Sequence, residues 1–145
     1  MKKIKIIKRA AKNPRVLKNN DAYDGVLINW DGTVYDGVVN TDPTNTYEYR
    51  GEIVSGEYIA KKKIRASGMV VWELETLEGS KIIPATQQNK KHGGKKQMVA
   101  VQIHVGGRTW DGSHGCITVH PDFWFRIRAG WDDVMKVEIT EEKNT

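Results

Sequence analysis

The residues best suited to covalent chemistry lie between positions 104 and 120. This stretch holds the only cysteine of the chain, Cys116, and three of its four histidines, His104, His114 and His120. A thiol reacts as its thiolate, and a neighbouring imidazole or backbone amides can lower its ordinary pKa of about 8.5. The combination therefore indicates a cysteine nucleophile served by a histidine base.

The expected local structure positions this pair. His104 ends an apolar strand expected over residues 98–104, where a side chain can be held rigidly towards a cleft. Cys116 follows Ser113 and Gly115, and these small residues allow a sharp turn that presents backbone N–H groups to an oxyanion. A strand, a turn and a returning segment readily bring two such positions together, although their spacing alone does not prove contact.

Three other interpretations of these residues stay open. A lone cysteine is more often a small buried apolar residue, but the polar, flexible residues before Cys116 disfavour a core strand. Zinc could be held by His104, His114, Cys116 and His120, yet no compact zinc-motif spacing is present, so we expect no metal and no other cofactor. His120, directly before Pro121, is expected to cap a helix rather than to act in catalysis.

The chain as a whole reads as short strands with one helix. Strands are expected over residues 26–30, 33–39, 69–77, 81–84, 98–104 and 134–140, and a helix over 120–130. Asp31-Gly32 predicts a two-residue type I′ turn between the first two strands. Residues 87–97 are polar and are expected to form an exposed loop. These patterns predict a single, mainly β domain over 1–145 with one short helix after the cysteine.

Composition narrows the class of protein and of partner. With 39% hydrophobic and 28% charged residues, the 145-residue chain is typical of a globular domain rather than a disordered one. No apolar run approaches the roughly 20 residues of a membrane span, so no transmembrane segment is expected. The net charge of +5 favours an anionic partner such as nucleic acid, lipid headgroups or a cell-wall polymer. The first 20 residues are especially basic and lack the apolar stretch of a secretory signal, which predicts synthesis in the cytoplasm.

The residues around the cysteine also carry a resemblance. Ile103-His104 followed by Ser113-His114-Gly115-Cys116-Ile117 resembles the active-site signature of the YkuD-type L,D-transpeptidase catalytic domain. Residues 54–58 resemble the Gly-x-Tyr strand upstream in such domains, and the likeness spans about 48–140, leaving 1–20 as a basic N-terminal segment. It implies a β-sandwich with one short helix after the catalytic cysteine.

The resemblance also implies roles for individual residues. Cys116 would attack a stem-peptide carbonyl and form a thioester, with His104 as general base and then acid. The amides of Gly115 and Cys116 would hold the oxyanion, and Ser113 or His114 would orient the histidine or shape the turn. Substrate contacts would come from Arg108, Trp110 and Thr118, the last standing where the family usually has arginine.

The expected function is that of an endolysin-like cysteine peptidase that cuts the stem or cross-link peptides of bacterial peptidoglycan. It would reach the cell wall after holin-type release or delivery. An L,D-transpeptidase or an antibacterial effector of the same fold is the alternative within this class. A basic nucleic-acid-binding or virion structural module is the alternative of another class, but no nucleic-acid motif is recognisable, so no nucleic-acid partner is expected. The sequence leaves the oligomeric state open.

Overall fold

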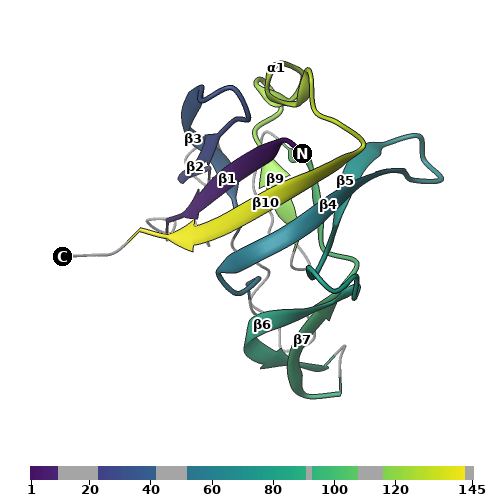
Figure 1. The fold of residues 1–145 in the computed structure, drawn as a ribbon. Helices are drawn as coiled ribbons and strands as arrows, with labels where there is room; N and C mark the ends of the chain where they lie inside the picture. Colours follow the sequence, from purple (N-terminus) through teal and green to yellow (C-terminus); the bar gives the residue numbers. More distant parts are fainter. Residues whose placement is uncertain (10–22, 42–51, 91–92, 108–115, 143–145) are drawn as a thin grey trace.

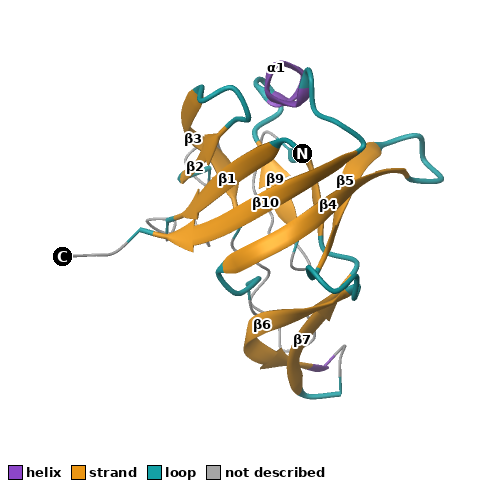
Figure 2. Ribbon diagram, in the orientation of Figure 1, coloured by secondary structure: helices purple, strands orange, loops and turns teal. Residues whose placement is uncertain are grey.

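The structure is a computed structural model that describes residues 1–9, 23–41, 52–90, 93–107 and 116–142. In these residues the elements are β1 (Lys3–Lys8), β2 (Gly25–Ile28), β3 (Val34–Asn40), β4 (Gly56–Ile64), β5 (Val70–Glu75), β6 (Ile82–Asn89), β7 (Lys95–Val99), β8 (Gln102–Val105), β9 (Ile117–Val119), α1 (Trp124–Arg128) and β10 (Val134–Glu141). The fold is therefore mainly β with one short helix among the described residues, as the sequence predicts (Figure 2). None of the described residues forms a helix of the length and apolar character needed to cross a membrane.

Eight strands close into a barrel in the order β1-β10-β4-β5-β8-β9-β3-β2, and β6 and β7 form a separate two-stranded sheet. The pairs β1–β10 and β8–β9 are parallel, and the other neighbours in the barrel are antiparallel. In Figure 1, α1 lies at one end of the barrel and the β6–β7 hairpin at the other. The sequence analysis expects two packed sheets, whereas eight of the strands form a sheet closed on itself.

Closure depends on β1, which the sequence analysis treats only as part of a basic segment. Ile4 and Ile6 are fully buried in the core, while Lys3 and Lys5 face outwards and pair with Glu138 of β10. β1 bridges β10 and β2, and so joins the two edges of the sheet. The alternation of lysine and isoleucine is the period-2 pattern of a half-buried strand, which the high charge conceals.

The barrel interior is apolar, and a cluster of tryptophans fills part of it. Trp72, Trp124 and Trp131 pack edge to face with ring centroids 4.9–6.1 Å apart. Two of the indole N–H groups have acceptors: Trp131 Nε1 donates to Asn29 Oδ1 at 2.7 Å, and Trp72 Nε1 donates to the Asp132 carbonyl at 2.9 Å. Trp124 and Ile127 attach α1 to this cluster, so burial rather than length stabilises the five-residue helix.

The helix is shorter than the range 120–130 predicted from the sequence. Phe123 N donates to the His120 carbonyl at 3.0 Å, so a turn precedes α1, and Phe123 is the N-cap. His120 Nδ1 accepts from Asp122 N at 3.0 Å, which stabilises that turn, so the prediction that His120 caps the helix itself is wrong. The predicted end is confirmed, because Gly130 follows the helix with φ +82°.

Three connections also differ from expectation. Only Gly32 of the Asp31-Gly32 pair has positive φ, and Asn29 N bonds to Thr33 O at 2.8 Å, so the hairpin has a three-residue loop rather than a type I′ turn. The strand predicted over 98–104 is two strands, β7 and β8, separated at Ala100, whose φ is +56°. Most of the loop predicted over 87–97 belongs to β6 and β7, which pair with each other.

Candidate functional site

The adjacent parallel strands β8 and β9 position the predicted base and nucleophile. Ile103 pairs with Ile117 and His104 with Thr118, and Cys116 immediately precedes β9. Because Ile103 and Ile117 point into the core, the alternation of side chains directs Gln102, His104, Cys116 and Thr118 to the outer face. His104 pairs with Thr118, so Cys116 lies two residues before the partner of His104 on the same face of the sheet.

The backbone of the preceding strand surrounds the half-buried Cys116 thiol. Its Sγ donates to the Ala100 carbonyl at 3.8 Å, and the Gln102 backbone amide hydrogen bonds to the sulfur. Ala100 is the residue of positive φ between β7 and β8, so this break in the chain turns its carbonyl towards the sulfur. The sulfur thus donates one hydrogen bond to the Ala100 carbonyl and accepts another from the Gln102 amide, and the two bonds hold it in one place.

The pKa of Cys116 is raised, whereas the sequence analysis expects neighbouring groups to lower it. Burial raises the pKa of the thiol above its ordinary value, and the charge of Glu73 acts in the same direction. The Gln102 amide and the charge of Arg65 oppose this rise but do not overcome it. Cys116 is therefore a neutral thiol near pH 7, and it needs a base at the moment of attack.

We expect iodoacetamide to alkylate Cys116 slowly at pH 7 and progressively faster as the pH rises through 9. The reason is that only the thiolate reacts and burial raises the pKa of the thiol. The rate is measured as mass gain of the folded protein against pH, with the urea-unfolded chain as the control. A folded protein that reacts faster than the unfolded chain at pH 7 would contradict the neutral thiol.

His104 has the protonation state that a base requires. Its Nδ1 lies 2.7 Å from the Val105 carbonyl, which only accepts hydrogen bonds, so Nδ1 carries the proton and Nε2 is the basic nitrogen. Burial lowers the pKa of His104, the charge of Arg65 lowers it further, and the Val105 carbonyl opposes both. The ring is neutral at pH 7, and the backbone holds it in the tautomer that can accept a proton at Nε2.

The sequence analysis missed two polar residues beside the thiol, Arg65 and Gln102. Arg65 lies at the β4–β5 turn, where its amide bonds to the Met69 carbonyl at 2.9 Å, and its side chain reaches over the outer face of the sheet. Arg65 Nε donates to Gln102 Oε1 at 2.8 Å, and Nη2 donates to the same oxygen. Gln102 is buried and lies next to the sulfur, so it connects the arginine to the nucleophile.

Glu73 continues this network into a hollow on the outer face. Gln102 Nε2 donates to Glu73 Oε2 at 3.3 Å, and Lys63 and Lys81 pair with the same carboxylate at 3.3 and 3.2 Å. Burial acts to raise the pKa of Glu73, but hydrogen bonds from Gln102, Lys81 and Lys63 outweigh it and lower the pKa. Glu73 is therefore an anion that holds Gln102 in position.

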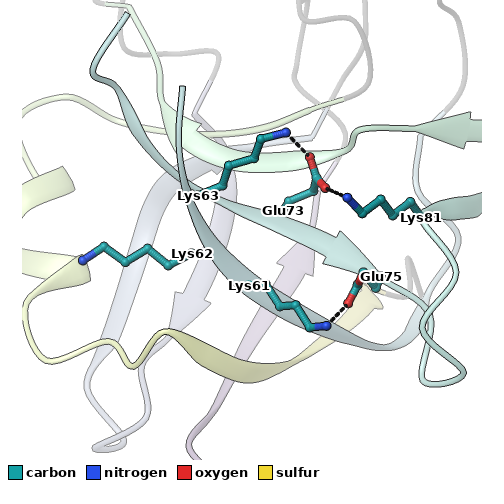
Figure 3. A pocket seen from close by; sticks show the side chains of 6 residues that line it. All are labelled: Lys61, Lys62, Lys63, Glu73, Glu75 and Lys81. Carbon is teal, nitrogen blue, oxygen red and sulfur yellow. Dashed lines mark hydrogen bonds and ion pairs between the residues drawn. The ribbon is translucent and has the colours of Figure 1, made fainter. Parts of the chain in front are cut away.

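The hollow has a volume of about 270 Å³ and is lined by charged side chains of both signs. Its lining residues are Lys61, Lys62, Lys63, Glu73, Glu75 and Lys81. Figure 3 shows Lys63 and Lys81 converging on Glu73 and Lys61 reaching Glu75, whereas Lys62 points away from the others. Each lysine that faces the hollow is thus paired with a buried carboxylate.

Of the substrate-contact residues predicted from the sequence, the structure describes only Thr118. Its hydroxyl donates to the Asn40 carbonyl of β3 at 3.5 Å, so it helps to join β9 to β3. The remaining predicted site residues, Arg108, Trp110, Ser113, His114 and Gly115, lie outside the described residues. The structure therefore brings together His104, Cys116 and Thr118 and adds Arg65, Gln102 and Glu73.

Tyr23 fixes the chain immediately after His104. Its hydroxyl donates to the Gly107 carbonyl and lies directly over Gly106. A Cβ at Gly106 would meet that hydroxyl and would lie 3.1 Å from both Tyr23 Cζ and Thr118 Cβ. The Tyr23 ring packs edge to face on His120 with centroids 5.0 Å apart. Glycine is therefore required at 106 because a buried tyrosine crosses the strand end.

Gly106→Ala is expected to destabilise the fold by about 1–3 kcal/mol, the usual cost of overpacking. The cause is the contact of the new methyl group with the Tyr23 hydroxyl. Urea unfolding monitored by tryptophan fluorescence measures the effect, and Tyr23→Phe in the same chain is expected to restore part of the loss. Equal stability of Gly106→Ala and wild type would show that Tyr23 does not lie over this strand end.

The histidines are not arranged as metal ligands in the part of the chain that the structure describes. No three histidine, cysteine or acidic side chains there form a group that could hold a metal ion. His120 is buried, with its Nδ1 accepting from Asp122 N and its ring between Tyr23 and Phe123. His114, another of the four residues considered for zinc, lies outside the described residues.

Comparison of the chain with protein-family models, curated proteins and solved structures finds no match.

Proposed function

We propose that the protein is a cysteine peptidase that cuts the stem or cross-link peptides of bacterial peptidoglycan through a thioester on Cys116. The observation that carries the proposal is the parallel β8–β9 pair, which directs His104 and Cys116 to one face of the barrel. The neutral, backbone-oriented ring of His104 and the neighbouring thiol are the two groups that acyl transfer requires.

Acylation follows from these protonation states. Sγ of Cys116 attacks the peptide carbonyl carbon as its proton passes to Nε2 of His104, and the carbonyl oxygen becomes an oxyanion. When the intermediate collapses, the carbon–nitrogen bond breaks and the leaving amine takes the proton from His104. The products of this half-reaction are a free amine and a thioester on Cys116. The neutral starting pair is suited to this sequence because no charge has to be buried before substrate binds.

Deacylation uses the same groups in reverse. Water gives a proton to His104 and attacks the thioester, and the Cys116 sulfur leaves with that proton. The half-exposed position of Cys116 supports hydrolysis, because water can reach the thioester carbon. An amine from a second stem peptide would instead give transpeptidation, which remains the alternative reaction of the same site.

We also propose that the chain is a divergent YkuD-type L,D-transpeptidase catalytic domain, which acts on the cell wall after holin-type release or delivery. The order of elements supports it: the histidine strand β8 is followed by the cysteine, β9, the short helix α1 and the closing strand β10. This is the order that the resemblance implies after the histidine. The closed barrel differs from the β-sandwich that the resemblance implies.

The alternative of a nucleic-acid-binding or virion module gains no support from the basic N-terminal residues that the structure describes. Their charges are paired with carboxylates of the barrel: Lys2 with Asp132, Lys3 and Lys5 with Glu138, Lys8 with Glu141, and Arg9 with Asp36 and Glu142. Cations paired in this way present less unbalanced charge to phosphates. The observations on this segment therefore favour a role in folding.

Mass spectrometry of purified peptidoglycan treated with wild type and with Cys116→Ser tests the proposal. The wild type is expected to release peptides with new carboxyl and amino termini, which identify the bond cut. Digestion in ¹⁸O-labelled water distinguishes the two reactions, because hydrolysis places ¹⁸O in the new carboxyl group and transpeptidation does not. No release by wild type, or equal release by Cys116→Ser, would overturn the proposal.

A further inference from the structure

Arg65 has no carboxylate partner among the described residues, unlike Lys61, Lys63 and Lys81 of the neighbouring hollow. Lys61, Lys63 and Lys81 each lie within 3.3 Å of a glutamate oxygen. Arg65 is half-buried, and the contacts of its guanidinium are with the neutral amide oxygen of Gln102. No carboxylate in the described part of the chain pairs with its positive charge, and a partly buried unpaired cation favours an incoming anion.

The contacts that Arg65 makes with the described residues engage only one edge of its guanidinium. Arginine has five N–H donors, and Arg65 directs Nε and Nη2 to a single acceptor, Gln102 Oε1. The terminal Nη1–Nη2 edge is the edge that matches a carboxylate with two parallel hydrogen bonds. Arg65 therefore presents the recognition edge of its side chain while the other edge is fixed.

Gln102 sets the position of this edge relative to the nucleophile. Its side-chain oxygen accepts from Arg65, its side-chain amide donates to the buried Glu73, and its backbone amide bonds to the Cys116 sulfur. One residue thus touches both the guanidinium and the thiol. The charge of Arg65 also acts, after the larger effect of burial, on the pKa values of both Cys116 and His104.

We propose that Arg65 is a specificity-determining residue that binds a free carboxylate of the substrate within about one residue of the carbonyl that Cys116 attacks. This inference rests on the proposed function, because it assigns the substrate of the same site: a peptide with a free carboxyl group next to the scissile bond. A peptide amidated at that carboxyl group offers no anion to the guanidinium and binds more weakly.

The test measures binding to the full chain carrying Cys116→Ala, so that no turnover interferes. Isothermal calorimetry compares a synthetic stem tetrapeptide with its carboxy-terminal amide. The free acid is expected to bind about tenfold or more tightly, the usual difference for a charge-assisted bidentate contact. Adding Arg65→Gln is expected to remove this preference, and Arg65→Lys, which keeps the charge without the fork, to retain only part of it.

Lys62→Gln is the matched control, because it removes one positive charge from the neighbouring strand β4 at a side chain that points away from Glu73 and Glu75 (Figure 3). It is expected to leave the preference unchanged. The role of Arg65 is overturned if the preference for the free acid survives Arg65→Gln. It is also overturned if Cys116→Ala alone shows no preference, or if neither peptide binds. Because binding is read without catalysis, a preference that depends on Arg65 in a protein that cuts no peptidoglycan would reject the proposed function and keep this inference.

Discussion

Replacing Cys116 with alanine is expected to lower the rate of peptide release from peptidoglycan by about a thousandfold or more. Alanine has no group that can form the thioester, and His104 alone would have to activate water without the covalent step. The measurement is the initial rate of peptide release from purified walls by equal amounts of wild type and variant.

The same substitution is expected to change the free energy of unfolding by less than about 1 kcal/mol, since the thiol is half-buried and outside the core cluster. Urea unfolding of both proteins supplies this control. Loss of activity together with a large loss of stability would indicate a structural cysteine. Retained activity in a folded variant would exclude Cys116 as the nucleophile.

His104→Gln is expected to reduce turnover by about 10²–10⁴-fold, the usual contribution of a general base. The loss is expected to fall on kcat more than on KM, because Nε2 acts on the proton of Cys116 and not on substrate binding. Glutamine keeps a polar side chain near the Val105 carbonyl, so the fold is expected to persist. Steady-state kinetics on a soluble stem peptide measure the two constants, and a variant with wild-type kcat would remove His104 from the mechanism.

The pH profile supplies an independent check on His104. Activity requires the neutral ring, and burial lowers the pKa of His104 below its ordinary value near 6.5. Activity is therefore present above that lowered pKa and is lost as the pH falls through it, so the acid limb of kcat/KM is expected below pH 6.5. An acid limb above pH 6.5 would show that a different group, or a differently placed histidine, acts as the base.

The elements that could be predicted are those that a short stretch of sequence indicates by itself. The strands ending at Glu75 and Glu141 and the stop at Gly130 follow from apolar runs, alternation and glycine in a positive-φ position. β1 was missed because its alternate residues are lysine, and charge was given more weight than period. Closure into a barrel was missed for the same reason, since β1 makes the pairs that join β10 to β2.

The candidate site could likewise be predicted only in part. His104 and Cys116 could be predicted because their residue types and near neighbours indicate chemistry. Arg65 and Gln102 could not, because 37 positions separate them and only the pairing of β5 with β8 brings them together. The raised pKa of Cys116 also depends on burial of the thiol, which its residue type does not indicate.

The measurement that tests the central claim most directly is the intact mass of the protein acid-quenched during turnover of a soluble stem peptide. A thioester predicts a transient mass increase equal to the acyl fragment, located on Cys116 and removed by hydroxylamine. His104→Gln is expected to slow its appearance, and Cys116→Ser is expected to lack the hydroxylamine-sensitive adduct. Cleavage of the peptide with no adduct at any quench time, and at an undiminished rate in Cys116→Ser, would contradict the account.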